Sequence, residues 1–289
     1  MVAAPPKLEV RAVGAESFDD IAPLFDLFEN RKMTREDWRA MLFTYPWWEG
    51  AERGFALYAN GVAVGFLGTI FSRRNIDGRD ETFCNASCWV VREAYRSASI
   101  LLLKPVLAMR DRTIVNWTPT ERSYEIFAKL GFRPLESESL LLPPLATPWS
   151  FRGSVEIEPD RVAAALSEPE RSIQRDLASR PNVRHIVLRD GDRTCYVVAT
   201  RRLVKGFPIA DVHYVGDNDF FWKHRGLAII AFLRAFGAIG MAIDKRFAGE
   251  RNRRIAIRRP AMRLYRPTDP ETPPEAIDGL FSETMTLRL

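Results

Sequence analysis

Groups that could hold an anion come together where an apolar strand gives way to an apolar helix. The stretch Cys88–Val91 is β-branched and aromatic and predicts a strand end, and Ser99–Met109 predicts a buried helix. The polar turn between them, Arg92–Ser99, is rich in small residues and contains Arg96. The first backbone N–H groups of a helix have no partner within the helix. The turn therefore predicts a cradle for an anion such as a phosphate.

A second helical pattern follows in the same stretch of chain. Tyr124–Phe132 reads as a short helix that is stopped by Gly131. Together with the turn, this segment resembles the acyl-CoA N-acyltransferase (GNAT) superfamily. The family pattern at the turn is V-x-P-x-Y-R-G-x-G-x-G, which the chain follows at Val91, Tyr95 and Arg96 and departs from at each glycine.

The second family pattern is N-x-x-A-x-x-L-Y-x-K-L-G-F. The chain matches it at Ser123, Ile126, Lys129, Leu130, Gly131 and Phe132. Thr120 stands where the family has asparagine, and Phe127 stands where the family has tyrosine. In the family that tyrosine protonates the departing CoA thiolate, so the usual acid is missing here.

The resemblance implies acetyl-CoA or another acyl-CoA as cosubstrate and no metal. It assigns the pyrophosphate to the turn residues Arg96, Ser97, Ala98, Ser99 and Ile100 and the pantetheine arm to the strand residues Trp89, Val90 and Val91. In the family a main-chain amide after a strand bulge polarises the thioester, and Val90 or Val91 would do this with any side chain. Ser97 and Ser99 offer hydroxyl donors in place of the family's glycines.

Three residues are candidates for handling protons or the acceptor. Tyr124 lies one helical turn before Phe127 on the same face, so its hydroxyl could serve as the acid. Asn85 lies where some relatives place a glutamate base; an amide could orient a water or the acceptor. His213 follows Asp211 by two residues on a strand, which resembles a base with an orienting carboxylate. For each of them, simple packing is the alternative role.

Composition restricts the class of protein. With 289 residues, of which 46% are apolar and 27% charged, the chain predicts a globular protein long enough for two domains. We read it as cytoplasmic, because the start MVAAPPKLEV lacks a signal pattern and Gly226–Ile243, apolar apart from Arg234, predicts a buried helix rather than a membrane span. Cys84 and Cys88 would share one face of a strand as core thiols.

The two halves repeat each other in outline, which predicts an α/β protein with two tandem GNAT-like mixed sheets flanked by helices. The predicted domains are residues 1–143 and 153–289, joined by a linker at 144–152. Asn60-Gly61 predicts a tight hairpin in the first half. At the turn of the second half, Asp217 and Asp219 lie among aromatic residues and would repel phosphate. We therefore expect the second copy to be degenerate.

Three functions remain open. The first is an acyl-CoA-dependent N-acyltransferase that acts directly on a small-molecule or peptide amine. The second is a catalytically inactive GNAT-like protein that binds CoA or a partner. The third is tRNA-dependent aminoacyl transfer, which the six arginines between Arg251 and Arg263 favour, although such a run is also compatible with a solvated basic face. For the first function we expect neither a membrane nor a nucleic acid as partner.

Overall fold

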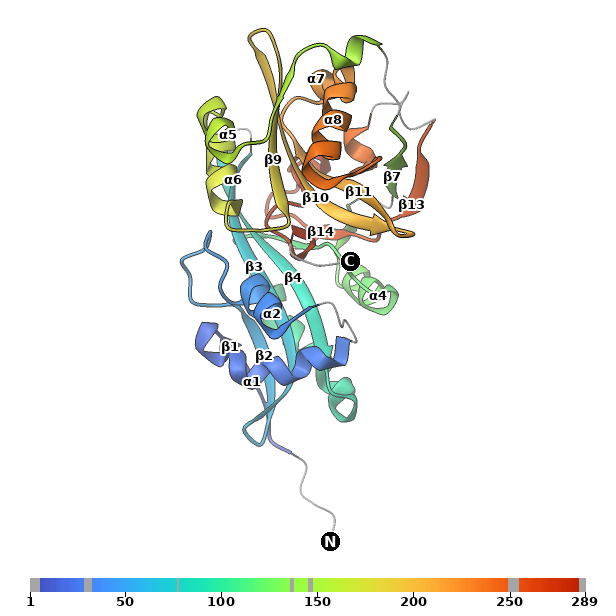
Figure 1. Ribbon diagram of the computed structural model, residues 1–289. Coiled ribbons are helices and arrows are strands. Elements are labelled where there is room, and N and C mark those ends of the chain that lie inside the picture. Colours follow the sequence, from blue (N-terminus) through green and yellow to red (C-terminus); the bar gives the residue numbers. More distant parts are fainter. Residues whose placement is uncertain are drawn as a thin grey trace. The chain divides into compact units, whose positions relative to one another are not determined.

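The computed structural model (Figure 1) describes residues 6–28, 33–76, 78–135, 138–144, 148–248 and 255–285. The chain forms two compact units. The first unit comprises Met1–Arg133, Arg263–Thr272 and Phe281–Arg288, and the second comprises Pro134–Met262, Pro273–Leu280 and Leu289. Each unit contains one seven-stranded sheet with helices packed against it, as predicted.

The sheet of the first unit has the strand order β1-β2-β3-β4-β5-β14-β6. Its strands are β1 (Leu8–Val13), β2 (Gly54–Ala59), β3 (Val62–Ile76), β4 (Arg79–Val91), β5 (Thr113–Asn116), β6 (Arg133–Pro134) and β14 (Leu264–Arg266). Strands β1 to β4 pair antiparallel, whereas β4 and β5 pair parallel, so the sheet is mixed. Asn60 and Gly61 join β2 to β3 with φ angles of 50° and 84°. Both angles are positive, as the predicted tight turn requires.

Helices cover both faces of this sheet. They are the 3₁₀ helix Ala15–Ser17, α1 (Phe18–Ile21), the 3₁₀ helix Ala22–Phe28, α2 (Arg35–Leu42), the 3₁₀ helix Glu93–Leu102, α3 (Leu103–Ala108), α4 (Glu121–Lys129) and the 3₁₀ helix Glu283–Met285. On β3, Phe66 and Ile70 pack with side chains of α1 and α2, whereas Leu67 and Phe71 pack with side chains of α3 and α4. Since strand side chains alternate between faces, β3 is buried on both sides.

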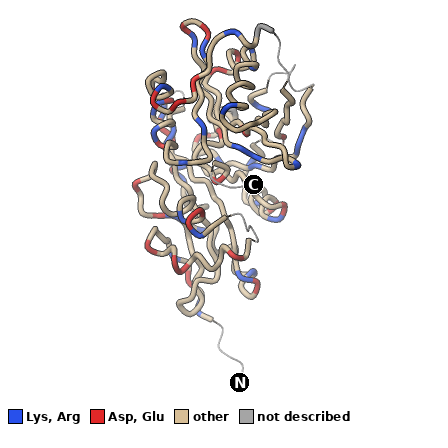
Figure 2. Tube along the Cα trace, viewed as in Figure 1, with Lys and Arg blue, Asp and Glu red and all other residues tan. Residues whose placement is uncertain are grey.

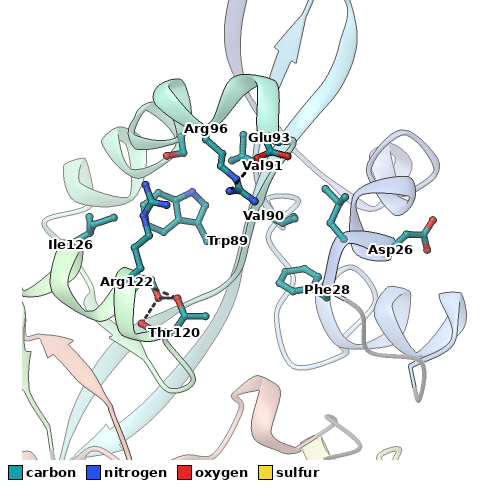
Figure 3. Close-up of a pocket in the computed structure, with 13 residues that line it drawn as sticks. Asp26, Phe28, Trp89, Val90, Val91, Glu93, Arg96, Thr120, Arg122 and Ile126 are labelled. Atoms are coloured by element: carbon teal, nitrogen blue, oxygen red, sulfur yellow. Dashed lines mark hydrogen bonds and ion pairs between the residues drawn. The ribbon is translucent and has the colours of Figure 1, made fainter.

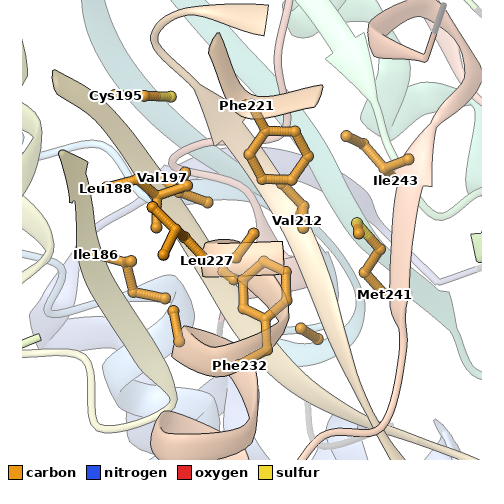
Figure 4. Close-up of a cluster of buried hydrophobic side chains, with 14 of the residues drawn as sticks. Ile186, Leu188, Cys195, Val197, Val212, Phe221, Leu227, Phe232, Met241 and Ile243 are labelled. Carbon is orange, nitrogen blue, oxygen red and sulfur yellow. The ribbon is translucent and has the colours of Figure 1, made fainter. Parts of the chain in front are cut away.

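The sheet of the second unit has the strand order β13-β7-β12-β11-β10-β9-β8. Its strands are β7 (Glu138–Leu142), β8 (Ser154–Glu156), β9 (Val183–Asp190), β10 (Arg193–Val204), β11 (Phe207–Val215), β12 (Met241–Asp244) and β13 (Ile257–Pro260). Its helices are the 3₁₀ helix Pro148–Phe151, α5 (Pro159–Ala165), α6 (Glu170–Leu177), α7 (Asn218–Lys223), α8 (Arg225–Phe236) and the 3₁₀ helices Lys245–Phe247 and Pro274–Ala276. Figure 4 shows Phe221, Leu227 and Phe232 of the helices packed on sheet residues such as Val197 and Val212.

The sequence predicted one buried helix over Gly226–Ile243, and this prediction is wrong: the stretch forms a helix followed by a strand. Helix α8 ends at Phe236, where Gly237 takes a φ of 64° and closes it. Met241–Asp244 then forms the buried strand β12. A short apolar run does not distinguish a buried helix from a buried strand, and the glycine decides the boundary. Within the described part of the chain, no helix is long and apolar enough to cross a membrane.

The predicted repeat is confirmed by topology. The order β8-β9-β10-β11-β12 in the second sheet reproduces β1-β2-β3-β4-β5 in the first. The parallel contact is equally short in both units, since β4 pairs with β5 over three positions and β11 pairs with β12 over three positions. The sequence matches between the halves therefore correspond to equivalent strands.

The unit boundaries differ from the predicted domains 1–143 and 153–289. Strand β7, which precedes the predicted linker 144–152, pairs with β12 and belongs to the second sheet. Strand β14, from the far end of the chain, pairs with β5 in the first sheet. Hydrogen bonding at a sheet edge involves only backbone groups, so the sequence pattern shows that a strand forms but not which edge receives it. Residues 145–147 of the linker lie outside the described residues.

Candidate functional site

A β-bulge distorts the end of β4, at the residues assigned to the pantetheine arm. The register runs from Phe66 opposite Val90 to Gly68 opposite Ser87, so β4 carries one extra residue at Cys88–Trp89. Cys88 has a φ of 55°, in the left-handed region. A bulge redirects the side chains around it and leaves a residue outside the ladder. The sequence resemblance anticipated this feature.

The bulge also corrects the prediction that Cys84 and Cys88 share a face. Cys84 packs in the cluster on the α3–α4 side, whereas Cys88 packs against the cluster on the α1–α2 side. The left-handed residue changes the alternation along the strand. Burial raises the pKa of both thiols to about 12, so they are inert packing groups at neutral pH.

The strands β4 and β5 pair over only a short distance. Their contact runs from Phe83 opposite Thr113 to Asn85 opposite Val115, and β5 ends at Asn116. Strand β4 continues to Val91, beyond the end of this pairing. The backbone of this last stretch can pair with an extended ligand that adds like a strand.

A pocket of about 540 Å³ opens at this end of β4 (Figure 3). Its described lining residues are Asp26, Leu27, Phe28, Trp89, Val90, Val91, Glu93, Arg96, Ser99, Thr120, Arg122, Ser123 and Ile126. The structure thus brings together five of the eight predicted cofactor residues, namely Trp89, Val90, Val91, Arg96 and Ser99. Ser97 and Ile100 are exposed, and Ala98 packs against the core on the α3–α4 side. The pocket has an apolar floor and a polar rim.

Two arginines, Arg96 and Arg122, and two acids, Asp26 and Glu93, are the charged residues that line the pocket. In Figure 3, Arg96 comes from the 3₁₀ helix Glu93–Leu102 and Arg122 comes from α4, with Trp89 between these elements. The Arg96 guanidinium lies 3.8 Å from the Glu93 carboxylate, and the two side chains are 60% and 87% exposed. The sequence reasoning did not include Arg122. Its position in the first turn after the N-cap Thr120 is the signal that could have identified it.

The turn itself differs from the prediction of a helix that begins at Ser99. A 3₁₀ helix begins directly after β4 at Glu93, and its N-cap residue, Arg92, has no side-chain cap among the described residues. In a 3₁₀ helix each N–H from the fourth residue onward bonds the carbonyl three residues earlier. The amides of Ser97–Ile100 therefore lie within the helix, and its amide end is at Glu93. Without glycines the segment Glu-Ala-Tyr-Arg-Ser-Ala-Ser closes into helical turns.

Helix α4 turns a different face to the pocket than the sequence suggested. Arg122, Ser123 and Ile126 line the pocket, whereas Tyr124 packs against the hydrophobic cluster on the α3–α4 side. Phe127 is fully buried and lies edge-on to Trp89, with ring centroids 6.1 Å apart. The residue in the position of the family's tyrosine thus supports the pocket floor from within the core. Tyr124 as the acid remains a prediction.

Asn85 is buried and bonded to an acid that the sequence reasoning missed. Its amide nitrogen donates to Oε2 of Glu283, and the Thr118 hydroxyl donates to Oε1. Glu283 is 1% exposed, and burial raises the pKa of its carboxyl group. The residue lies far from Asn85 in sequence, within the phrase Phe-Ser-Glu-Thr-Met at 281–285. The apolar residues Phe281 and Met285, two positions to either side of it, are the sequence signal that it could be buried.

His213 belongs to the second unit, where it is the extra residue of an equivalent bulge. The register runs from Tyr214 opposite Val198 to Val212 opposite Ala199, which leaves His213 outside the ladder. Its Nε2 lies 2.8 Å from the Thr200 hydroxyl. The Asp211 carboxylate is bonded to Arg202 at 3.1 Å. Because Thr200 is the cross-strand partner of Asp211, His213 and Asp211 lie on one face of the sheet, as predicted.

In the turn after β11, the carboxylate of Asp217 occupies the start of the next helix. Asp217 caps α7 by accepting from the Phe220 N–H at 2.9 Å and forms an ion pair with Arg193 at 2.7 Å. The Phe220 amide, and also Arg193, lower the pKa of the Asp217 carboxyl group. A protein carboxylate thus occupies the place where an anionic ligand would meet the helix start. The geometry supports the expectation of a degenerate second copy.

The charged run near residue 251 is only partly described. Arg251, Arg253 and Arg254 lie outside the described residues, whereas Arg258 and Arg259 belong to β13. Figure 2 shows acidic and basic residues interspersed along both units. Among the described residues, no group of three or more His, Cys, Asp or Glu side chains could hold a metal ion.

Comparison with known proteins gives similarity in structure but not in sequence. No family model matches the chain, and no curated protein matches it. A GCN5-related N-acetyltransferase from Anabaena variabilis aligns with a TM-score of 0.59 at 13% identity, over 91% of this chain and 73% of that one. A probable N-acyltransferase of unknown function from Enterococcus faecalis aligns with a TM-score of 0.64 at 10% identity, over 91% of this chain and 73% of that one.

A third similar structure covers the whole chain. N-Myristoyltransferase from Saccharomyces cerevisiae, with bound myristoyl-CoA and inhibitors, aligns with a TM-score of 0.57 at 9% identity, over 100% of this chain and 88% of that one. At such identities the likeness establishes the fold. The chain has a two-sheet GNAT fold, as its bulged β4 and the short parallel β4–β5 contact indicated.

Proposed function

We propose that this protein is an acyl-CoA-dependent N-acyltransferase that transfers acetyl or another small acyl group directly to an amine. The observation that carries the proposal is the convergence of three features at one pocket. The bulged end of β4, its departure from β5 and the arginines Arg96 and Arg122 all meet there. The similar structures with acyltransferase names support this choice.

Each part of the pocket suits one part of an acyl-CoA. Arg96 and Arg122 would bind the pyrophosphate through charge-assisted hydrogen bonds. The backbone of Trp89–Val91 would pair with the amides of the pantetheine arm. The amide of Val90 or Val91 would polarise the thioester carbonyl as its oxygen gains negative charge. The amine nitrogen then forms a bond to the carbonyl carbon, and the carbon–sulfur bond breaks to release the thiolate.

Two observations favour a second candidate, a GNAT-like protein that binds CoA without turnover. Phe127 occupies the position of the family's acid and is fully buried. The turn has closed into a 3₁₀ helix in which the amides of Ser97–Ile100 are already engaged. Both changes remove functional groups that the family uses and leave the pocket in place. Aminoacyl transfer from tRNA remains the third candidate and rests on the arginine run alone.

Calorimetric titration with acetyl-CoA, CoA and longer acyl-CoAs tests these candidates together with a thiol-release assay. The enzyme hypothesis expects binding of acetyl-CoA, and CoA release in the presence of at least one member of a panel of amines, amino sugars and peptides. Binding without release on the whole panel would favour the inactive protein. Absence of binding to all the CoA compounds would refute both and leave the tRNA-dependent reaction.

A further inference from the structure

Glu283 is a buried acid with neutral hydrogen-bond partners. Asn85 donates to one carboxylate oxygen and Thr118 donates to the other. Among the described residues, no Lys, Arg or His side chain forms an ion pair with it. A buried carboxylate without a cation is destabilising, and such groups concentrate where a protein uses the proton. The position of Glu283 therefore needs an explanation beyond packing.

The segment that carries Glu283 is fixed within the first unit. The ring of Phe281 packs on Trp47, with centroids 5.2 Å apart, and Arg74 lies 5.5 Å over the same ring. The hydroxyls of Ser282 and Thr284 lie 2.6 Å apart. These contacts hold the short 3₁₀ helix Glu283–Met285 in place, and this helix positions Glu283 beside β4.

Glu283 lies where β4 and β5 begin to separate. Asn85 is the last residue of β4 that pairs with β5, and Thr118 lies just beyond the end of β5. Continuing along the two segments, the chain reaches Trp89 and Thr120, and both of these line the pocket. The carboxylate thus lies between the two chain segments that lead to the pocket, four residues before Trp89 on β4 and two residues before Thr120. Thr118 is itself exposed, which provides an approach from solvent.

Asn85 supplies a second observation at the same place. The residue is 3% exposed, and its Oδ1 atom is buried with no hydrogen-bond partner among the described residues. An orphaned acceptor next to a carboxylate suits a ligand that brings N–H donors. A primary amine in its protonated form has three such donors. The pair therefore matches the acceptor of the proposed reaction.

We propose that Glu283 is the proton acceptor for the attacking amine and that Asn85 holds this amine through Oδ1. The inference rests on the proposed function. The Glu283 carboxylate takes one proton from the ammonium group, and the neutral nitrogen forms its bond to the thioester carbon. The carbon–sulfur bond breaks, and the thiolate receives the second amine proton. Glu283 then returns the first proton to solvent, so the products are an amide, CoA thiol and one proton.

The test is the pH profile of acetyl transfer to the best amine of the panel in Glu283→Gln. We expect kcat/KM to fall about 10²-fold, the usual size of one acid–base contribution. In wild type, activity should rise as the pH increases past the pKa of the Glu283 carboxyl group, and this rise should be absent in Glu283→Gln. The affinity for acetyl-CoA should be the same in both proteins. Glu81→Gln, which removes an acid on β4 that does not contact Asn85, is the matched control and should keep the wild-type profile.

Two further measurements keep the inference falsifiable. Asn85→Asp places a second carboxyl group beside Glu283, so the acidic limb should move to higher pH, an effect that a packing role would not produce. If Glu283→Gln does not unfold cooperatively, it is not properly folded, and the pH profile of Asn85→Asp then decides whether Glu283 accepts the proton. Infrared difference spectra should show a carboxyl group that titrates above the usual range in wild type and is missing in Glu283→Gln. A folded Glu283→Gln with wild-type rate and profile would overturn the inference and leave the acyltransferase proposal intact. Failure of wild type to transfer would overturn both.

Discussion

Replacing Glu93 with glutamine should make the protein bind CoA more tightly. Glu93 is an acid that lines the pocket beside Arg96, with the charged atoms 3.8 Å apart. Its side chain is 87% exposed, so water screens its interactions strongly. Two unit charges about 4 Å apart interact by roughly 1 kcal/mol in water. Glu93 partly neutralises Arg96 and also repels a bound pyrophosphate, and Glu93→Gln removes both effects.

The expected gain is about 1 kcal/mol, which corresponds to an approximately fivefold lower Kd for CoA. Arg122→Ala should act in the opposite direction, with Kd rising about tenfold, because it removes a charge-assisted donor to phosphate. Both effects should shrink at an ionic strength of about 1 M, where the screening length falls to about 3 Å. Isothermal calorimetry at low and high salt measures all of these quantities.

The controls lie on the exposed side of α4. Glu125→Gln removes an acid and Lys129→Ala removes a base, and neither residue lines the pocket. Both variants should bind CoA as wild type does. If Glu93→Gln binds no more tightly and Arg122→Ala no more weakly, the pyrophosphate does not bind at this rim, and the assignment of the site is wrong.

Three further predictions concern single side chains. Ser99→Glu should weaken CoA binding in calorimetry by on the order of 2 kcal/mol, through charge repulsion within the pocket, whereas Asp219→Glu should leave it unchanged. Tyr124→Phe should lower kcat by about 10²-fold if its hydroxyl is the acid, whereas a kcat within about twofold of wild type would show that the ring only packs with the core. Burial lowers the pKa of His185 to about 4, so the unfolded chain takes up a proton before the folded one. Stability should therefore fall as the pH drops from about 6.5 to about 4, by up to about 3 kcal/mol, and His185→Gln should lose this part of the pH dependence in chemical denaturation.

Local patterns in the sequence were sufficient for most of the strands and for the pocket floor. Trp89, Val91 and Arg96 follow one another around a single turn, so a motif of short range could place them at one site. The hairpin at Asn60-Gly61 was predictable for the same reason, since its backbone angles depend on two adjacent residues.

What the sequence could not provide depends on contacts between distant residues. The pairing of β14 with β5 brings residues near 265 to residues near 115, and no local pattern encodes the choice of edge. Glu283 is bonded to Asn85, which lies 198 residues away in the sequence. The 3₁₀ helix Glu93–Leu102 depends on the backbone conformation of ten consecutive residues, and a position-by-position comparison with a motif does not reveal it.

The two units show how one fold can keep its shape and lose a site. Both have the bulge in the equivalent strand and the same short parallel contact, so these two features belong to the shared topology. The difference lies in the helix start that follows. In the second unit Asp217 already accepts from the Phe220 amide and is neutralised by Arg193, so an external anion would have to displace a carboxylate tethered within the chain. In the first unit the corresponding helix begins without a side-chain cap, and Arg96 and Arg122 face the pocket beside it. The capping carboxylate Asp217 is therefore one difference between the two helix starts, because it satisfies an amide in the second unit and the first unit has no such side-chain cap among its described residues.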